Sequence, residues 1–224
     1  MPASVSVIIP ALDEAERIAA TIDAAFAAGA AEVIVADGGS RDATIRIARE
    51  HGAQVISGQS MRSRQLNAGA QLASHRTLLF LHADTLLPAG AAEAVTRAID
   101  DGAIFGGFRI AFIEQTLGLR WTAFAINFRT RFSRAPWGDQ AHFIRRADFL
   151  RLGRYREIPL MEDYDLAVRM KRHGKIAILP LPVHTSGRRF LEKGLVRTTC
   201  INWLVVLAFR LGVSPNRLAR WYRG

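Results

Sequence analysis

The sequence of 224 residues contains one cysteine, Cys200, which excludes an internal disulfide and any zinc site built from a cysteine cluster. We expect no signal peptide either, because the first apolar stretch, residues 5–12, has no basic region before it and is broken by Pro10. Both absences are typical of a protein kept in a reducing compartment. We therefore expect a cytoplasmic protein.

No hydrophobic run is long enough to span a bilayer. The apolar segment of residues 198–213 is too short and is closely bounded by Arg197 and Arg210. Basic and aromatic residues follow it: Arg217, Arg220, Trp221, Tyr222 and Arg223. Burial as a C-terminal helix is the favoured interpretation. A face for a homo-oligomer and a peripheral contact with the inner face of the membrane stay open.

Acidic and basic residues are divided unevenly along the chain. Residues 1–108 hold 8 Lys/Arg and 12 Asp/Glu, a net charge of −4, whereas residues 109–224 hold 22 and 8, a net charge of +14. This asymmetry indicates either a basic surface that serves solubility or an anionic partner for the C-terminal half. The candidate partners are a lipid headgroup, a phosphorylated acceptor and nucleic acid.

The first hundred residues alternate between the periods of strands and helices. Residues 5–9 form a β-branched run that Pro10 ends, and Asp13 is expected to cap a helix over residues 14–28. Further strands are predicted at residues 32–36, 54–56 and 77–81, and further helices at residues 42–51 and 62–73. This order predicts an α/β fold, with a parallel sheet covered by helices.

The regular alternation weakens after residue 84. Helices are predicted at residues 89–99, 117–132 and 162–172, and strands at residues 106–113, 141–144 and 176–179, the last ended by Pro180. The helix at residues 117–132 is amphipathic and rich in aromatic residues and arginine. The chain shows no repeats, low-complexity tracts or Gly/Ser linkers, so we expect a single domain.

Polar residues follow three of the predicted strands, at residues 10–14, 37–40 and 82–84. Ligands of α/β proteins bind at the carboxyl ends of the strands. Gly38 and Gly39 would let a ligand approach the backbone closely. No G-x-G-x-x-G follows the first strand, which excludes a dinucleotide-binding oxidoreductase.

Five segments, in order, resemble the motifs of family 2 glycosyltransferases, which have the GT-A fold. Residues 7–14 are similar to the opening of the family, and residues 36–44 to its motif Asp-(Gly/Asp)-Gly-Ser-x-Asp-x-Thr. Residues 64–69 resemble its Arg-x-x-Asn-x-Gly helix, and residues 80–84 stand where it has the Asp-x-Asp metal motif. Residues 162–166 look like its Glu-Asp motif, which holds the catalytic base.

The resemblance runs from about residue 4 to residue 185 and extends to a subgroup of short bacterial members. It implies a GT-A type α/β fold, in which a mostly parallel nucleotide-binding sheet is flanked by helices and followed by a C-terminal helical segment. The single glycosyltransferase domain would have three parts. These are a nucleotide-sugar-binding half (1–108), an acceptor and catalytic half (109–190), and a basic amphipathic segment (191–224).

For the nucleotide-sugar donor, the resemblance implies contacts with Pro10, Leu12, Glu14, Asp37, Gly38, Arg64 and Ala83. Asp84 would hold a Mn²⁺ or Mg²⁺ ion between the two phosphates, and His184 would complete the metal shell. Such hard cations take carboxylate and phosphate oxygens. UDP is favoured over GDP, and Arg188 and Arg189 are suited to clamping its diphosphate.

One position departs from the family pattern: the first acid of Asp-x-Asp is His82. In the family that acid tends to contact the ribose, so its replacement need not abolish metal binding at Asp84, but it affects the strength and identity of the metal. Histidine suits Mn²⁺ better than Mg²⁺. Metal ligation and a single hydrogen bond at the strand end remain equal interpretations of His82.

Asp163 is predicted to be the general base, which takes the proton from the acceptor hydroxyl in a direct transfer with inversion. Glu162 would support the site. Trp137 is expected to stack on the acceptor, and Asp139 or Gln140 to hydrogen-bond it. A simple turn into the next strand is an equal interpretation of this segment. The acceptor itself, whether lipid-linked, a glycan or a small molecule, stays open.

Two other functions compete with the glycosyltransferase. A metal-dependent nucleotidyltransferase would share the α/β sheet and the acidic metal site, but the first strand is not followed by a glycine-rich basic loop that would grip a triphosphate. A non-enzymatic protein that binds anions or nucleic acid would explain the basic half alone. It would leave the acidic strand ends without a purpose, and no nucleic-acid-binding motif is present.

Overall fold

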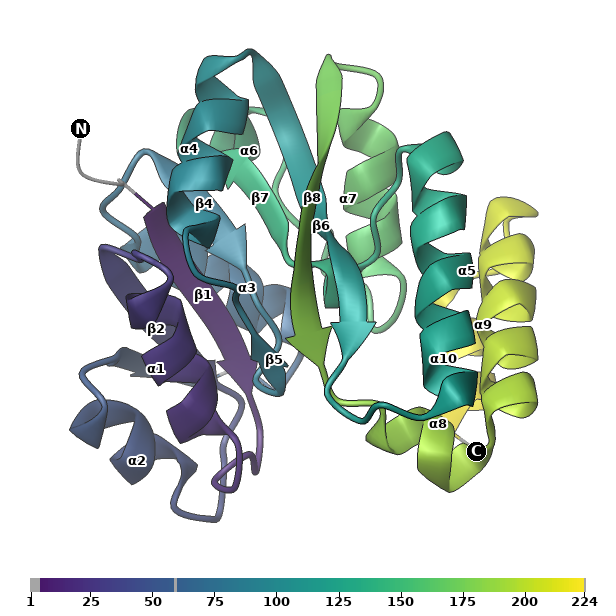
Figure 1. Ribbon diagram of the computed structural model, residues 1–224, viewed down its shortest axis with the longest axis horizontal. Helices are drawn as coiled ribbons and strands as arrows, with labels where there is room; N and C mark the ends of the chain where they lie inside the picture. The colour runs from purple at the N-terminus through teal and green to yellow at the C-terminus, as the bar shows by residue number, and fades with distance from the viewer. Residues whose placement is uncertain (1–4, 59, 224) are drawn as a thin grey trace.

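A central eight-stranded sheet carries helices on both faces in the computed structural model, which describes residues 5–58 and 60–223 (Figure 1). The strands are β1 (Val5–Ala11), β2 (Glu32–Asp37), β3 (Gln54–Ser57), β4 (Thr77–Phe80), β5 (Thr85–Leu86), β6 (Ala103–Phe112), β7 (His142–Arg145) and β8 (Lys175–Thr185). Their spatial order is β3-β2-β1-β4-β7-β6-β8-β5. The first four are parallel, β7 is antiparallel to β4 and β6, and β8 is parallel to β6. The predicted mostly parallel α/β sheet is therefore confirmed.

Helices connect and cover these strands. They are α1 (Ile18–Ala27), α2 (Thr44–Glu50), α3 (Arg62–Leu72), α4 (Ala91–Asp100), α5 (Leu117–Ser133), α6 (Arg146–Arg151), α7 (Glu162–Met170), α8 (Arg188–Lys193), α9 (Leu195–Arg210) and α10 (Pro215–Arg223), with a 3-10 turn at Gly138–Gln140. Most of the predicted helices are present, with ends that differ by a few residues. The short helices α6 and α8, the turn and β5 were not predicted, because elements of two to six residues leave little periodicity to read.

Alternate residues of β1 separate the two faces of the sheet, as the period of a strand requires. Val7 and Ile9 pack with Ile22 of α1 and Val95 of α4 on one face. Ile8 packs on the other face with residues of α3, α6 and α7. All of these β1 side chains are fully buried, so the sheet is held rigidly from both sides and its strand ends are fixed in position.

Two expectations about the chain path were wrong. Asp13 does not cap α1: it has a left-handed backbone (φ 53), and α1 begins at Ile18. Pro180 does not end β8, which continues to Thr185 because a register irregularity opposite Phe108 and Arg109 takes up the proline-containing segment. A bulge of this kind accommodates prolines, which cannot donate a ladder hydrogen bond.

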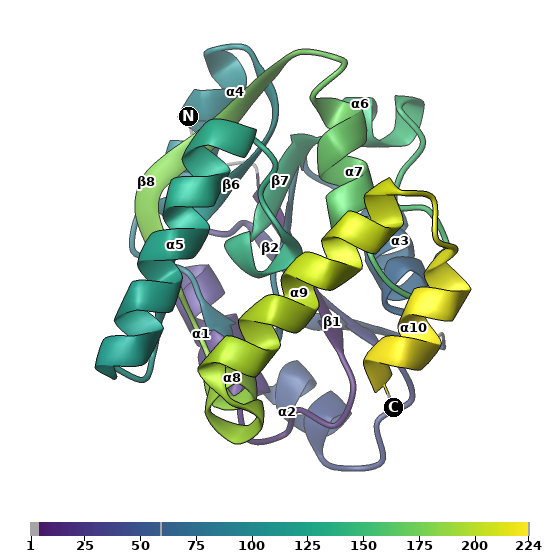
Figure 2. The ribbon, with the colours of Figure 1, turned by 90° about the vertical axis from the view of Figure 1, so that its right-hand side faces the viewer.

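The C-terminal segment forms α9 and α10, which lie on the same side of the molecule as α5 (Figure 2). Val205 and Leu218 are buried in a cluster that includes Met161, so the favoured interpretation of burial holds for one side of α9. On its other side Trp203 and Leu207 are exposed. Within residues 5–58 and 60–223, we find no helix with the length and apolarity needed to cross a membrane.

Candidate functional site

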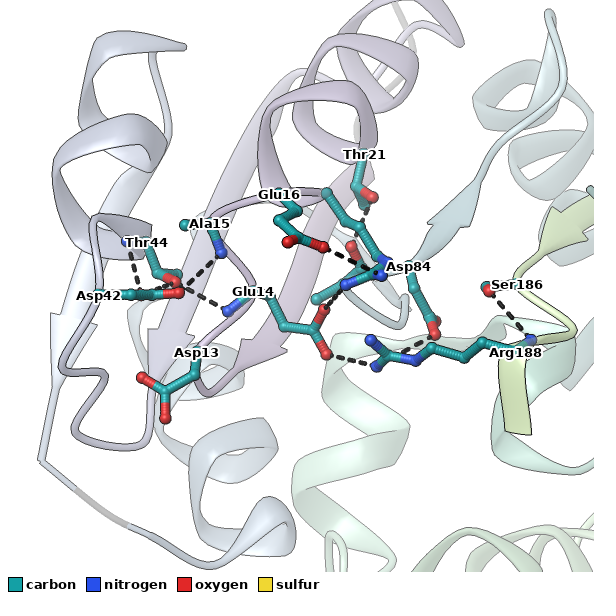
Figure 3. A network of polar contacts seen from close by, with 12 residues as sticks. Asp13, Glu14, Ala15, Glu16, Thr21, Asp42, Thr44, Asp84, Ser186 and Arg188 are labelled. Carbon is teal, nitrogen blue, oxygen red and sulfur yellow. Dashed lines mark hydrogen bonds and ion pairs between the residues drawn. The ribbon is translucent and has the colours of Figure 1, made fainter. Parts of the chain in front are cut away.

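The loop after β1 is joined to the loop after β2 by side-chain hydrogen bonds (Figure 3). The backbone amide of Glu14 donates to Oγ1 of Thr44 over 2.9 Å, and that of Ala15 donates to Oδ2 of Asp42 over 3.1 Å. In the other direction, the amide of Arg41 donates to Oδ1 of Asp13 over 2.8 Å. These bonds hold Glu14 at the carboxyl end of β1, next to the end of β4.

Asp37 closes the turn after β2 and is 1% exposed. Its Oδ2 accepts hydrogen bonds from the amides of Gly39 and Ser40 over 2.8 and 3.0 Å. Gly38 is needed for space, because a Cβ there would lie 2.9 Å from Nε2 of Gln65. That amide nitrogen donates to the carbonyls of Ala11 and Ala36 and so ties the ends of β1 and β2 together. Asp37 and Gly38 thus shape the loop that follows β2.

A first cavity, of about 480 Å³, opens at the ends of β1 and β4. Its lining includes four of the residues predicted to bind the nucleotide: Pro10, Leu12, Glu14 and Ala83. Asp84, the predicted metal ligand, lies in the same wall. Residues more than seventy positions apart in the sequence are therefore brought together as the resemblance implies. We refer to this space as the first cavity.

A second cavity, of about 370 Å³, adjoins the first. Trp137, Asp139, Glu162 and Asp163 line it, so most of the predicted catalytic and acceptor residues share one space. The two cavities have four lining residues in common: Arg62, His82, Asp84 and Arg188. A group that crosses from one cavity to the other must pass these four side chains.

Arg188 stands between two carboxylates at this junction (Figure 3). Its Nη2 lies 2.8 Å from Oε1 of Glu14 and 3.7 Å from Oδ2 of Asp84. Burial raises the pKa of Asp84; the charge of Arg188 opposes this rise and that of Glu14 adds to it. The pKa of Arg188 is raised, because the hydrogen bond and charge of Glu14 outweigh its partial burial. The two acids therefore share the charge of Arg188, and Glu14 also has Nη1 of Arg17 at 3.6 Å from its Oε2.

Asp163 is held in place at the start of α7. Its Oδ2 accepts a hydrogen bond of 2.7 Å from the backbone amide of Gly138, and its Oδ1 one of 2.7 Å from the amide of Tyr164. Both donors are backbone amides, which fix the orientation of the carboxylate. Beside it, burial raises the pKa of Glu162, whose Oε1 lies 3.5 Å from Nε of Arg62.

Asp139 is the carboxyl group most altered by its surroundings. Burial raises its pKa to about 6; the charge of Arg129 opposes this rise and that of Asp163 adds to it. Its Oδ1 is buried and has no hydrogen-bond partner among the described residues. The guanidinium of Arg129 stacks on Trp137 at 3.6 Å from the ring centre. Asp139 thus lines the second cavity and holds a buried acceptor atom that no described residue satisfies.

His82 is uncharged at neutral pH, because burial and the neighbouring charge of Arg62 hold its pKa well below its usual value. Its Nε2 contacts Nη2 of Arg62. A neutral ring that contacts a guanidinium through its free nitrogen acts as a hydrogen-bond acceptor. This arrangement supports the interpretation of His82 as a strand-end residue with one hydrogen bond.

Besides Asp37 and Gly38, three further predicted site residues lie outside both cavities. Arg64 is exposed and pairs with Glu157 at 2.8 Å, because it points away from the site on α3. Gln140 is fully buried, with its side-chain amide bonded to Phe108, Thr130 and the amide of Trp137. His184 pairs with Leu86 where β8 meets β5, while its neighbour Thr185 lines the second cavity.

Two arginines of the site were missed. Arg62 stands two positions before the predicted Arg64, and only the orientation of α3 shows which of them faces the cavities. Arg129 comes from α5, which the sequence analysis treated only as an amphipathic helix. Burial lowers its pKa to about 10, so it keeps its charge at neutral pH. An arginine buried beside two acids leaves no local signal in the sequence.

The acidic pair at the junction fits a divalent cation bound together with a diphosphate. Glu14 and Asp84 both face the nitrogen of Arg188, and Oε2 of Glu14 is buried with no hydrogen-bond partner among the described residues. Hard cations take such oxygen ligands and often share phosphate oxygens of the substrate. Within the described part of the chain, no group of three His, Cys, Asp or Glu residues could hold a metal alone. Phosphate oxygens would therefore have to complete the shell.

The fold corresponds to that of glycosyltransferases with the GT-A fold. Residues 6–152 match the family model described as Glycosyl transferase family 2, which covers well over half of the chain. The chain belongs to this family and is a glycosyltransferase. No curated protein matches it with significant similarity.

Solved structures share the fold. One is TarS from S. aureus, which is 15% identical, with a TM-score of 0.65 over 81% of this chain and 36% of TarS. This chain thus spans about a third of that protein. A second is glucosyl-3-phosphoglycerate synthase from Mycobacterium tuberculosis, solved with Mn²⁺, UDP and phosphoglyceric acid. It is 20% identical, with a TM-score of 0.65 over 94% of this chain and 79% of that one. A shorter TarS chain, solved with UDP-GlcNAc, is 14% identical, with a TM-score of 0.64 over 81% of this chain and 58% of that one.

Proposed function

We propose that the enzyme transfers a sugar from a nucleoside diphosphate donor, with UDP favoured, to an acceptor hydroxyl with inversion. One observation carries this proposal: the two cavities meet at Arg62, Asp84 and Arg188. The first cavity has the motif residues of a nucleotide site, and the second has the acids of a transfer site. A donor bound across the junction would present its sugar to the second cavity.

The first cavity is proposed to bind the nucleotide. Pro10, Leu12, Glu14 and Ala83 form its wall, and Asp37 and Gly38 support the loop behind it. Arg62 and Arg188 replace Arg64 as the cations next to the diphosphate, since guanidinium groups suit phosphate oxygens. The M. tuberculosis enzyme was solved with UDP and TarS with UDP-GlcNAc, which supports a uridine donor.

Asp84, with Glu14 beside it, would hold a Mn²⁺ or Mg²⁺ ion, and His184 is dropped from the set. When bound, such an ion neutralises negative charge on the departing nucleoside diphosphate. Arg188 already contributes a positive charge at this place, so it would have to move aside or share the phosphate oxygens.

Asp163 is proposed as the general base. Its carboxylate lines the second cavity and is oriented by the amides of Gly138 and Tyr164. It would take the proton of the acceptor hydroxyl as the oxygen attacks the anomeric carbon. Glu162, which lies next to Arg62, holds that arginine at the junction. The attack on the face opposite the nucleotide gives inversion.

Trp137 and Asp139 are proposed to bind the acceptor. Trp137 offers an aromatic face, and the free Oδ1 of Asp139 offers a hydrogen-bond acceptor. Gln140 anchors the turn that carries both. The second cavity also has apolar walls from Leu160 and Val206, so a lipid-linked acceptor, a glycan or a small molecule remain in the proposal. The division at residues 108 and 190 stays a prediction, because the second cavity also has walls from residues before 108 and after 190, such as Asp84 and Asn202. A cytoplasmic location is proposed as well.

Calorimetry with UDP and GDP, in Mn²⁺, Mg²⁺ or EDTA, tests the donor site. We expect metal-dependent binding of UDP that is lost in Asp84→Asn. The control is Asp100→Asn, whose exposed carboxylate pairs with Arg76 far from the site. If neither nucleotide binds under any condition, or if Asp84→Asn binds as tightly as the control, the donor site is wrong. UDP release from UDP-sugars then tests transfer, and the anomeric configuration of the product, compared with that of the donor, tests inversion.

A further inference from the structure

Helix α5 carries a ridge of four exposed aromatic side chains, which we call the aromatic ridge. Trp121, Phe124, Phe128 and Phe132 are 70, 59, 57 and 69% exposed. Neighbouring ring centres lie 5.9, 6.1 and 4.8 Å apart, so the four rings form a continuous line along the helix. Large apolar side chains in such a row indicate a contact surface, because isolated exposed residues need no explanation but contiguous ones do.

Arginines line a cavity along one flank of the aromatic ridge. The cavity, of about 610 Å³, lies between α5 and the strands β6 and β8. Its basic residues are Arg109, Arg120, Arg131 and Arg134. The only acid in its wall is Glu114, whose Oε2 accepts a 2.6 Å hydrogen bond from the amide of Gly187. Helix α5 itself, over residues 117–133, contains no Asp or Glu. The flank is therefore cationic, and Phe124 and Phe128 form its apolar border.

The other flank of the ridge continues onto α9. An apolar cavity of about 350 Å³ lies between the two helices, and Trp121 and Trp203 both line it. Figure 2 shows α5 and α9 on the same side of the molecule. Leu204 and Leu207 are also exposed, at 51 and 54%. The exposed apolar surface thus spans two helices, with arginines along one edge.

We propose that this face binds the surface of an anionic lipid bilayer. The aromatic ridge would enter the interfacial region, and Arg120 and Arg131 would pair with lipid phosphates. Helices that lie in the plane of a membrane combine an apolar face rich in Trp, Phe and Leu with basic residues, and aromatic rings favour the headgroup level. Helix α5, of 17 residues, is about 25 Å long, which suits such a contact.

Charge selects the lipid surface over a second copy of this chain. A two-fold interface would bring the same arginine-rich flank of both copies close together. Residues 109–224 carry a net charge of +14, so two such faces would repel each other. An anionic bilayer, in contrast, gains from each cation placed near its surface.

Vesicle flotation tests this proposal with no nucleotide or sugar present, so its result is independent of the donor and transfer reaction. The probes are vesicles of phosphatidylcholine alone and vesicles that also contain phosphatidylglycerol. We expect binding to the anionic vesicles only. Arg120→Gln/Arg131→Gln should weaken this binding by at least about tenfold at low salt. Phe124→Ser/Phe128→Ser should abolish the part of the binding that persists at high salt.

The matched control is Arg46→Gln/Arg97→Gln, which removes two exposed charges from α2 and α4. It should bind like the wild type, and all variants should keep their melting temperature because the changed side chains are exposed. Absence of binding to anionic vesicles overturns the proposal, as does equal loss in the control and the α5 variants. Two other results also overturn the proposal. One is a dimer in solution that dissociates in Phe124→Ser/Phe128→Ser. The other is binding of an oligonucleotide that these substitutions reduce while vesicle binding is unchanged.

Discussion

The backbone amide of Gly138 donates a 2.7 Å hydrogen bond to Oδ2 of Asp163 and so connects the turn after α5 to the start of α7. A side chain at Gly138 has no room: a Cβ would lie 2.8 Å from Oδ2 of Asp163, 3.0 Å from Nη2 of Arg62 and 3.1 Å from Nε2 of His82. Three groups of the junction thus converge on one glycine. The position of the proposed base depends on this close approach.

Asp163→Asn is expected to lower kcat by about 10² to 10⁴-fold, the usual contribution of a general base. An amide cannot take the acceptor proton, but it is similar in size, so affinity for UDP should change little. Asp165→Asn is the control on the same helix. Its carboxylate pairs with Arg156 and Arg169, outside both cavities, so it should cost about 2 kcal/mol of stability and leave kcat unchanged. Equal kcat values for Asp163→Asn and the wild type would contradict the assignment.

Gly138→Ala is expected to reduce kcat by about 10²-fold while the protein stays folded, because the new methyl group displaces Asp163 or Arg62. Gly212→Ala is the control. This glycine has a φ of 88°, and a Cβ there would have no atom within 4 Å. That substitution should cost about 1 kcal/mol through backbone strain without changing kcat. Steady-state kinetics and thermal unfolding separate the two effects. A Gly138→Ala enzyme with full activity would show that the position of Asp163 does not depend on this contact.

Asp139 gives the folded protein a dependence on pH. Its folded pKa of about 6 lies above the ordinary value of 3.8. As the pH rises, the unfolded chain therefore loses this proton before the folded protein does. The resulting stability is fully present below about pH 4 and is lost as the pH rises through about 6. From pH 5 to 7.5 this group should lower the free energy of unfolding by about 1 kcal/mol. Urea unfolding at several pH values measures the slope of the free energy of unfolding against pH. Asp139→Asn should remove the contribution of this group to that slope, while the exposed control Asp100→Asn should keep it. The same slope in all three proteins would place the pKa of Asp139 near its ordinary value.

Arg188→Met is expected to change the affinities for metal and nucleotide in opposite directions. Glu14 and Asp84 lose the cation between them, so Mn²⁺ alone should bind roughly fivefold more tightly. UDP should bind about tenfold more weakly, because a charge-assisted bond to phosphate is lost. Arg97→Met is the control, since Arg97 pairs with Glu93 at 3.5 Å on the exposed side of α4 and lines neither cavity. Calorimetry with each ligand separately measures both effects. Weaker binding of Mn²⁺ to Arg188→Met would show that Arg188 does not compete with the cation.

Much of the fold could be predicted because it depends on local patterns. The strand β1 is a β-branched run, and the helices from α1 to α4 have clear periods and short connections. Their order alone favours a parallel sheet. The chain path was mispredicted where a distant contact decides it. Asp13 accepts a hydrogen bond from Arg41 and so leaves α1 uncapped, and β8 passes Pro180 through a bulge against β6.

The sequence by itself determined the motif residues at the strand ends, because parallel strands place their carboxyl ends at one edge whatever the rest of the chain does. Glu14 and Asp84 follow β1 and β4 and could be named for that reason, whereas Asp163, at the start of α7, was named from the resemblance of its motif. Only the tertiary structure decided that Arg62 faces the site while Arg64 faces Glu157, and that Gln140 is buried as an anchor. It also set Arg129 beside Asp139. These outcomes depend on the rotation of helices and on desolvation by segments far away in the chain, and neither is encoded in local spacing.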